Sequence, residues 1–128
     1  MRETAQSIGK LGEDLAVRFL GNKGFVIIER NYLKPYGEID VVCLKEDVVH
    51  FVEVKSVSRL TSNKTLDEFR PEDNIHSKKL KRLSRVFEVY ISEKNIMLDW
   101  QFDVVTVIID KLAKTANITL VSDIVIGS

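Results

Sequence analysis

Two short segments constrain the fold of this chain more than any other feature of its sequence. Residues 37–40 read Gly-Glu-Ile-Asp, and residues 51–55 read Phe-Val-Glu-Val-Lys. Residues 39–44 and 48–54 are rich in apolar and β-branched side chains, and a polar break at residues 45–47 separates them. Two such runs joined by a short polar break predict a β-hairpin.

The register of this hairpin decides which side chains meet. If the polar break forms a symmetric two-residue turn, Asp40 faces Glu53 directly, and Leu44 faces Val49. Like charges directly opposite one another destabilise a sheet, with Cβ atoms about 5 Å apart, unless they share a cation. Lys55 lies two residues after Glu53 and shares its face. A turn of odd length would instead place Asp40 opposite a valine, and the break lacks the glycine that favours tight primed turns.

Two carboxylates, a hard cation and an ammonium group are suited to phosphodiester hydrolysis. Mg²⁺ prefers oxygen ligands and keeps several waters, so one water can attack while the ion polarises the phosphate. Lys55 would orient or help to deprotonate that water, or stabilise the charge that develops on the phosphate. The simpler alternative is a half-exposed antiparallel strand in which Glu53 and Lys55 are merely solvated.

Further short motifs follow in order along the chain. They are Gly12-Glu13, Gly24-Phe25, Arg30-Asn31-Tyr32, Lys79 with Arg82-Leu83, and Phe102-Asp103-Val104-Val105. With the two hairpin motifs, they resemble the YraN-like family of small bacterial proteins over roughly residues 7–107. The resemblance implies a restriction-endonuclease-like domain of the PD-(D/E)XK superfamily, near the archaeal Holliday junction resolvases. It also implies a nuclease whose biological substrate is not established.

The resemblance assigns roles to four residues by their positions. Asp40 would be the motif aspartate, and Glu13 the helix glutamate that completes the site. Glu53 and Lys55 would be the acid and the base of the Glu-x-Lys element. The implied ligands of Mg²⁺ or Mn²⁺ are thus Asp40, Glu53 and Glu13. Without the resemblance, Glu13 would be interpreted as a surface acid of the first helix. Ile39 replaces the proline of the superfamily motif, as is usual in this family.

Composition limits the other classes of function. The chain has 128 residues, of which 45% are hydrophobic, which predicts one domain over residues 1–128. The single cysteine, Cys43, is expected to be buried and excludes a disulfide framework. His50 is expected to be a core histidine, and Asp103 either supports the site or belongs to a polar network. No apolar signal segment or membrane-length run is apparent, so we expect a cytoplasmic protein without a membrane partner.

Charge is balanced over the whole chain but unevenly distributed. The 19 basic and 19 acidic residues give no overall attraction to nucleic acid, which counts modestly against a tight non-specific binder. Residues 76–85, however, hold five basic residues and no acid. Lys78, Arg82 and Arg85 would form a stripe along one helix face, with Lys79 beside it. This stripe predicts contacts with DNA phosphates, and its alternative is a solvated helix face.

The remaining patterns predict an α/β domain in which helices flank a mixed β-sheet, of the restriction-endonuclease-like kind. The polar segment 56–74 is expected to be a loop, either a mobile substrate flap or ordinary disorder. The first helix is expected to bury the apolar stripe Ile8, Leu11, Leu15 and Phe19. The expected helices span residues 7–22 and 75–93, a turn-rich segment covers 32–37, and the strands span 25–29, 39–44, 48–54, 97–109 and 117–126.

The sequence therefore predicts a divalent-metal-dependent nuclease that acts on DNA, with branched DNA as a candidate substrate. A resolvase-like enzyme would need a symmetric homodimer to cut two strands. The alternative is a non-catalytic nucleic-acid-binding or protein-interaction module that retains this fold.

Overall fold

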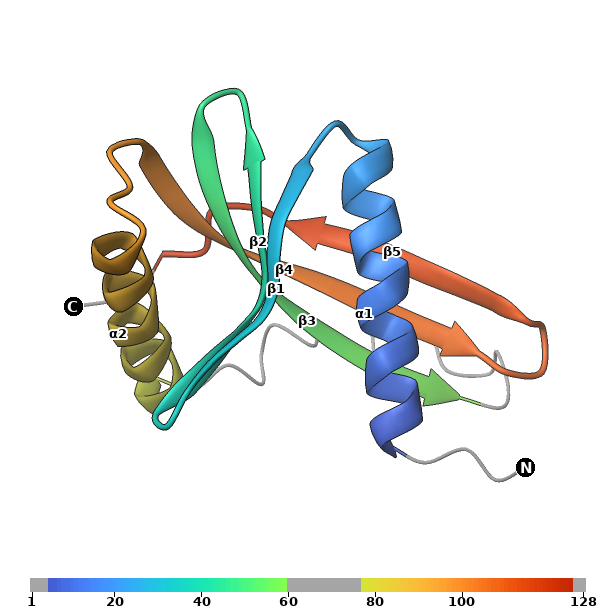
Figure 1. The fold of residues 1–128 in the computed structure, drawn as a ribbon. Helices are drawn as coiled ribbons and strands as arrows, with labels where there is room; N and C mark the ends of the chain where they lie inside the picture. Colours follow the sequence, from blue (N-terminus) through green and yellow to red (C-terminus); the bar gives the residue numbers. More distant parts are fainter. Residues whose placement is uncertain (1–4, 60–76, 126–128) are drawn as a thin grey trace.

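The computed structural model describes residues 5–59 and 77–125, which form an α/β domain (Figure 1). The predicted order of helices and strands is confirmed. No helix in the described ranges is long and apolar enough to cross a membrane. The elements are α1 (Ala5–Asn22), β1 (Val26–Lys34), β2 (Gly37–Lys45), β3 (Val48–Arg59), α2 (Ser77–Glu93), β4 (Asp99–Asp110) and β5 (Thr115–Val121).

The five strands form one mixed sheet in the order β1-β2-β3-β4-β5. Strands β3 and β4 are parallel, and the other neighbours are antiparallel. A parallel pair requires a crossover connection, and α2 lies in it. Helix α1 packs with one set of buried residues and α2 with another, so that the helices cover opposite sheet faces (Figure 1). This arrangement is consistent with the restriction-endonuclease-like fold.

The predicted register of the β2–β3 hairpin is confirmed. Leu44 pairs with Val49, and the last pair before the strands separate joins Val41 to Val52. The two turn residues, Glu46 and Asp47, have φ values of 50° and 63°. Positive φ at both central positions is the geometry of a tight primed turn, which here forms without glycine. The turn of odd length is excluded, and the same register continued by one residue beyond the last pair would place Asp40 opposite Glu53.

Helix α1 buries the predicted stripe only in part: Ile8 is buried, and Leu15 and Phe19 pack against the same core cluster. Leu11 is 42% exposed, and Leu15 and Phe19 are only partly buried. The face toward the sheet instead carries Ala16 and Leu20, which are fully buried. The stripe was expected from the helical period of the apolar residues, whereas the docked helix is turned so that Ala16 and Leu20 lie nearest the sheet.

Gly12 explains why this face of α1 lies toward the sheet. It is buried, and a Cβ atom at this position would lie 1.8 Å from Oγ of Ser56 on β3. The absence of a side chain therefore lets the helix axis approach β3 closely. Glu13 follows Gly12 directly, so the same close approach brings its carboxylate toward Asp40 on β2.

Two strands extend beyond their predicted ends. Strand β1 continues to Lys34, through part of the segment expected to be turn-rich, because Leu33 and Lys34 pair with β2. Strand β3 continues to Arg59, into the segment expected to be a loop, because its backbone pairs with β4 as far as Asp110. Backbone pairing with the neighbouring strand keeps these segments extended, although apolar and polar side chains do not alternate along them. Residues 60–74 of the expected loop lie outside the described residues.

The predicted core position of His50 is confirmed. Its Nδ1 lies 2.6 Å from Oδ2 of Asp103, which is fully buried. Asp103 also accepts hydrogen bonds from the side chain of Gln101 and from the backbone N–H of Asp123. Asp103 thus belongs to a polar network that fixes the segment after β5. Cys43 is a free, buried thiol, as expected.

Candidate metal centre

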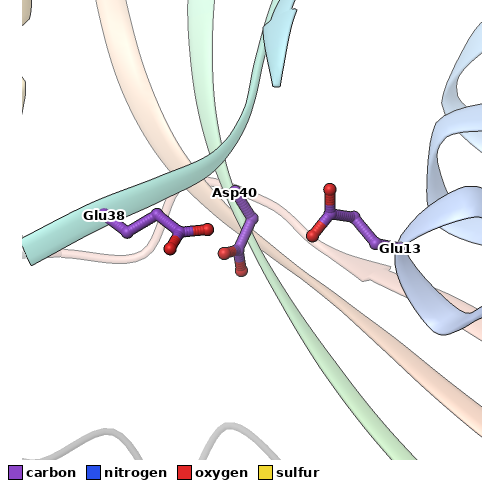
Figure 2. Close-up of side chains that lie close together, drawn as sticks. All are labelled: Glu13, Glu38 and Asp40. Carbon is purple, nitrogen blue, oxygen red and sulfur yellow. The ribbon is translucent and has the colours of Figure 1, made fainter. Parts of the chain in front are cut away.

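Three carboxylates converge where β2 leaves its pairing with β3. Oxygen atoms of Glu13, Glu38 and Asp40 all lie within 4.8 Å of one another (Figure 2). Glu13 comes from α1, whereas Glu38 and Asp40 alternate along β2 and therefore share a face. Like charges so close together repel, and a hard cation with oxygen ligands relieves that repulsion. We call these three residues the carboxylate cluster.

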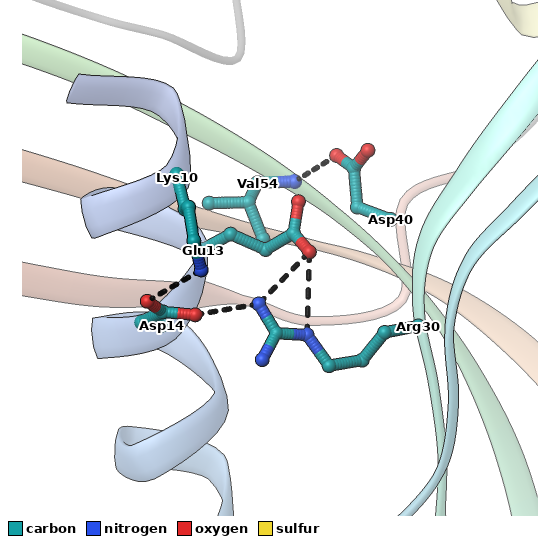
Figure 3. Close-up of polar contacts among 6 residues, drawn as sticks. All are labelled: Lys10, Glu13, Asp14, Arg30, Asp40 and Val54. Atoms are coloured by element: carbon teal, nitrogen blue, oxygen red, sulfur yellow. Dashed lines mark hydrogen bonds and ion pairs between the residues drawn. The ribbon is translucent and has the colours of Figure 1, made fainter. Parts of the chain in front are cut away.

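Asp40 lies at the centre of the cluster and is anchored to β3. Its Oδ2 accepts a hydrogen bond of 2.8 Å from the backbone N–H of Val54 (Figure 3). Burial raises the pKa of Asp40 to about 7, although the bond from Val54 opposes this shift. The charges of Glu53, Glu38 and Glu13 raise this pKa further. Asp40 is thus poised to lose its proton when a cation binds.

Arg30 on β1 positions Glu13. Its Nη2 and Nε lie 3.1 and 3.3 Å from Oε1 of Glu13, and Nη2 lies 2.7 Å from Oδ1 of Asp14 (Figure 3). The guanidinium thereby holds two consecutive acids of α1, and it directs Glu13 toward Asp40. Arg30 stood in a family motif, but its side-chain partners could not be deduced from that motif.

Glu53 lies apart from the cluster. It is buried, and its Oε1 lies 2.5 Å from Nζ of Lys79 and 3.3 Å from Nζ of Lys55. The carboxylate cluster found among the described residues contains Glu38 in its place. The role of Glu53 as a metal ligand stays a prediction. The spacing of Glu38 and Asp40 by two residues on one strand was the signal that could have identified Glu38.

The two lysines at Glu53 differ in their electrostatics. Burial lowers the pKa of Lys55, and the neighbouring Lys79 lowers it further, against the effect of Glu53. Burial would also lower the pKa of Lys79, but its contacts with Glu53 and Lys55 outweigh burial and raise it. Lys79 therefore stays cationic, whereas Lys55 gives up its proton more readily than an exposed lysine.

Asp40 separates two chambers of a cleft. The first chamber has a volume of about 680 Å³, and its lining includes Glu13, Asp40, Lys55 and Ser56. The second chamber, of about 290 Å³, lies toward α2. Asp40 lines both chambers, so the carboxylate cluster lies where they meet. The second chamber is lined by Tyr36, Gly37, Glu38, Asp40, Glu53, Lys79, Arg82 and Leu83.

The predicted basic stripe borders the second chamber. Arg82 lines the chamber, and the Arg85 guanidinium lies 4.1 Å from the ring centroid of Tyr36. Lys79 contacts Glu53, as described above. The side chain of Lys78 lies outside the described part of the chain. The predicted nucleic-acid contacts of these four residues stay predictions.

The fold and the cleft define a class: an α/β domain consistent with the restriction-endonuclease-like fold, with a cluster of acids that could hold a metal ion. The family model that matches residues 12–107 is described as Uncharacterised protein family UPF0102, and the chain belongs to this family. This confirms the resemblance to the YraN-like family that its motifs indicated.

Individual relatives match over nearly the whole chain. A UPF0102 protein of Dictyoglomus thermophilum is 37% identical over 110 residues, which is 85% of this chain and 88% of that protein. A UPF0102 protein of Dictyoglomus turgidum is 34% identical over 113 residues, with coverages of 88% and 91%. A UPF0102 protein of a Sulfurovum species is 35% identical over 121 residues, with coverages of 94% and 100%.

Proposed function

We propose that this protein is a divalent-metal-dependent nuclease that hydrolyses phosphodiester bonds of DNA, with branched DNA as the candidate substrate. One observation carries the proposal. The carboxylates of Glu13, Glu38 and Asp40 converge within 4.8 Å in a cleft that Lys55 also lines. Acids that can hold a metal ion, with an amine beside them in a cleft, are groups suited to metal-assisted phosphodiester hydrolysis.

The carboxylate cluster provides the ligands for Mg²⁺ or Mn²⁺, as both ions accept carboxylate oxygens. When bound, such an ion polarises the phosphate and lowers the pKa of a water molecule. Arg30 holds Glu13 in place, and Val54 holds Asp40 through its backbone N–H. These contacts fix two ligands before the ion arrives, which reduces the cost of organising the site.

Lys55 is the candidate for moving a proton. It lines the first chamber, and burial together with Lys79 lowers its pKa. A lysine with a lowered pKa accepts a proton from attacking water more readily once it is deprotonated, or it can stabilise charge on the phosphate while protonated. Either role requires the ammonium or amine group and not the aliphatic chain.

The proposal is tested by incubating purified protein with linear, nicked, flapped and four-way-junction DNA in Mg²⁺, Mn²⁺ or EDTA. Cleavage is expected only with a metal ion, and Asp40→Asn should abolish it. Asp47→Asn is the matched control, because Asp47 lies in the exposed hairpin turn and asparagine tolerates its positive φ. Wild-type protein that cuts no form of DNA or RNA with any divalent ion would contradict the proposal.

Lys55→Met separates an enzyme from a binding module. Methionine keeps much of the side-chain length but removes the charge, so DNA affinity should stay within a few-fold of wild type. Cleavage should fall by about 10²-fold or more, the usual effect of deleting an acid–base or electrostatic group. Unchanged cleavage by this variant would show that the active site has been assigned to the wrong residues.

A second candidate function is a nucleic-acid-binding module without catalysis. The ion pairs of Glu53 with Lys79 and Lys55 favour it, because they occupy the acid of the Glu-x-Lys element. In that case DNA binding would persist in EDTA and cleavage would be absent with every ion. A cut on both strands of a junction would in addition require a dimer, which the mass of the protein–DNA complex would reveal.

A further inference from the structure

Lys79 occupies an unusual place for a residue of a basic helix face. Its Nζ lies 2.5 Å from Oε1 of Glu53, so its charge points into the cleft. It lines the second chamber together with Glu38 and Asp40, and the charge of Asp40 also acts on it. An ammonium group among three acids is where a bound cation would be expected.

The same carboxylate oxygen of Glu53 contacts two lysines. Oε1 is 2.5 Å from Lys79 and 3.3 Å from Lys55, and the Glu53 side chain is only 10% exposed. A short, charge-assisted pair at a buried carboxylate is a strong contact. The Lys79 side chain is 37% exposed and belongs to α2, so its ammonium group can leave the carboxylate with a rotation of that side chain. Lys55 lies on the same strand as Glu53 and would remain beside it.

We propose that Lys79 is a positioning residue that competes with the divalent ion for the Glu53 carboxylate. This inference rests on the proposed function, because it takes the carboxylate cluster to be the metal centre. In the metal-free protein Lys79 holds Glu53 toward α2. When the ion binds, Glu53 joins the cluster, and Lys79 is released into the second chamber beside Arg82, where it can contact a DNA phosphate.

This competition accords with the structure, in which the Glu-x-Lys acid contacts Lys79 and does not belong to the carboxylate cluster. A divalent ion and an ammonium group that share one carboxylate repel each other, and the repulsion is stronger in a partly buried cleft than in water. Binding of the ion and the Lys79–Glu53 contact are thus coupled, and the coupling acts equally in both directions.

The experiment is a double-mutant cycle on metal affinity without DNA. The Kd of Mn²⁺ is measured by calorimetry for wild type, Lys79→Met, Glu53→Gln and the double variant. Lys79→Met should bind Mn²⁺ about tenfold more tightly, the scale of one charge-assisted hydrogen bond. In the Glu53→Gln background, the same change at Lys79 should alter the Kd by about twofold or less, since no shared carboxylate remains.

Two controls separate competition from simple loss of charge. Arg82→Gln also removes a positive charge that lines the second chamber, but no hydrogen bond joins Arg82 to Glu53 among the described residues. It should tighten Mn²⁺ binding by about twofold, the scale of a solvent-screened charge. Lys79→Arg keeps the charge and should keep the wild-type Kd. Far-UV circular dichroism verifies that each variant is folded.

These measurements distinguish a failure of the role proposed for Lys79 from a failure of the proposed metal centre. Equal effects of Lys79→Met and Arg82→Gln would overturn the role of Lys79 while leaving the metal centre in place. An effect of Lys79→Met that persists fully in the Glu53→Gln background would do the same. Wild-type protein that binds no Mn²⁺ or Mg²⁺ would overturn the proposed function, and the inference with it.

Discussion

Asp40 is the residue of the cleft whose pKa responds to burial, to the neighbouring acids and to a backbone hydrogen bond together. It lies at the end of the β2–β3 pairing, where its half-buried carboxylate sits beside two other acids and accepts a hydrogen bond from Val54. Burial raises its pKa to about 7, from an ordinary value of 3.8. The charged form of this residue therefore costs folding free energy when no cation is bound.

The first prediction concerns pH. Between the unfolded pKa of 3.8 and the folded pKa of about 7, the folded protein holds the Asp40 proton and the unfolded chain does not. The contribution of Asp40 is therefore most favourable at low pH and is lost as pH rises through 7. In EDTA, wild type should lose more unfolding free energy between pH 5 and pH 8 than Asp40→Asn does, as measured by urea titration.

Other groups titrate over this range, so the difference between the two proteins is the informative quantity. Asp47→Asn, at the exposed turn, should follow wild type. The same pH dependence in wild type and Asp40→Asn would mean that Asp40 is ionised throughout in the folded protein.

At the residue scale, the sequence predicted the place of a residue along its strand better than the side chains that it contacts. The period of two along a strand placed Asp40 across from Glu53, and backbone pairing is consistent with that placement. Which acids meet depends instead on how the helices dock. Helix α1 delivers Glu13 beside Asp40, and α2 delivers Lys79 to Glu53. Neither docking is encoded in a local pattern.

At the scale of elements, α1 shows why its buried face was predicted only in part. The prediction followed the helical period of the apolar residues and chose a stripe that includes Leu11, which is exposed. The structure instead places Gly12 against Ser56, which no large side chain would permit. A glycine in a helix is a poor helix former, so its presence there is a signal of close packing that periodicity alone does not weigh.

The second prediction follows from this packing. Gly12→Ala should destabilise the protein by about 1–3 kcal/mol, because the added Cβ would lie 1.8 Å from Oγ of Ser56 and the helix must shift. Gly9→Ala is the matched control, since a Cβ there would meet no heavy atom of the described residues within 4 Å. It should stabilise the helix by about 0.5–1 kcal/mol. Urea unfolding measures both, and equal effects would refute the packing argument.

The third prediction concerns α2. Replacing Lys78, Arg82 and Arg85 with glutamine should weaken DNA binding and flatten its salt dependence, because each lost phosphate contact lowers the log–log slope by about 0.9. Lys81→Gln is the control, as Lys81 is exposed on the same helix but lies outside the stripe. Fluorescence anisotropy at several salt concentrations gives both quantities. Unchanged affinity and slope would mean that DNA does not run over this helix.

The whole molecule is organised so that one site joins elements from distant parts of the chain. Helix α1 covers one sheet face and α2 the other, while the carboxylate cluster lies where α1 meets β2. The order of elements was predictable because the periodic segments are long, whereas the parallel pairing of β3 with β4 was found only in the structure. A cation in the cluster would cross-link α1 to the sheet, and its effect should therefore extend to global stability.

The last prediction measures this effect. An ion that binds only the folded state adds RT ln(1+[L]/Kd) to the unfolding free energy, about 2.7 kcal/mol at one hundred times Kd. Mn²⁺ or Mg²⁺ should thus raise the Tm of wild type, and the double change Glu38→Gln with Asp40→Asn should abolish the shift. The double variant should also melt higher than wild type in EDTA, because the repulsion within the cluster is relieved.

Glu88→Gln is the control for this experiment, because Glu88 is exposed on α2 and lies outside the cluster. It should keep the full metal-induced shift. A Tm shift that survives in the double variant would place the ion elsewhere, and Glu53→Gln would then be the next variant to measure, since Glu53 is the remaining predicted ligand on the sheet. A double variant that melts lower than wild type in EDTA would show that the three acids stabilise the fold without a cation.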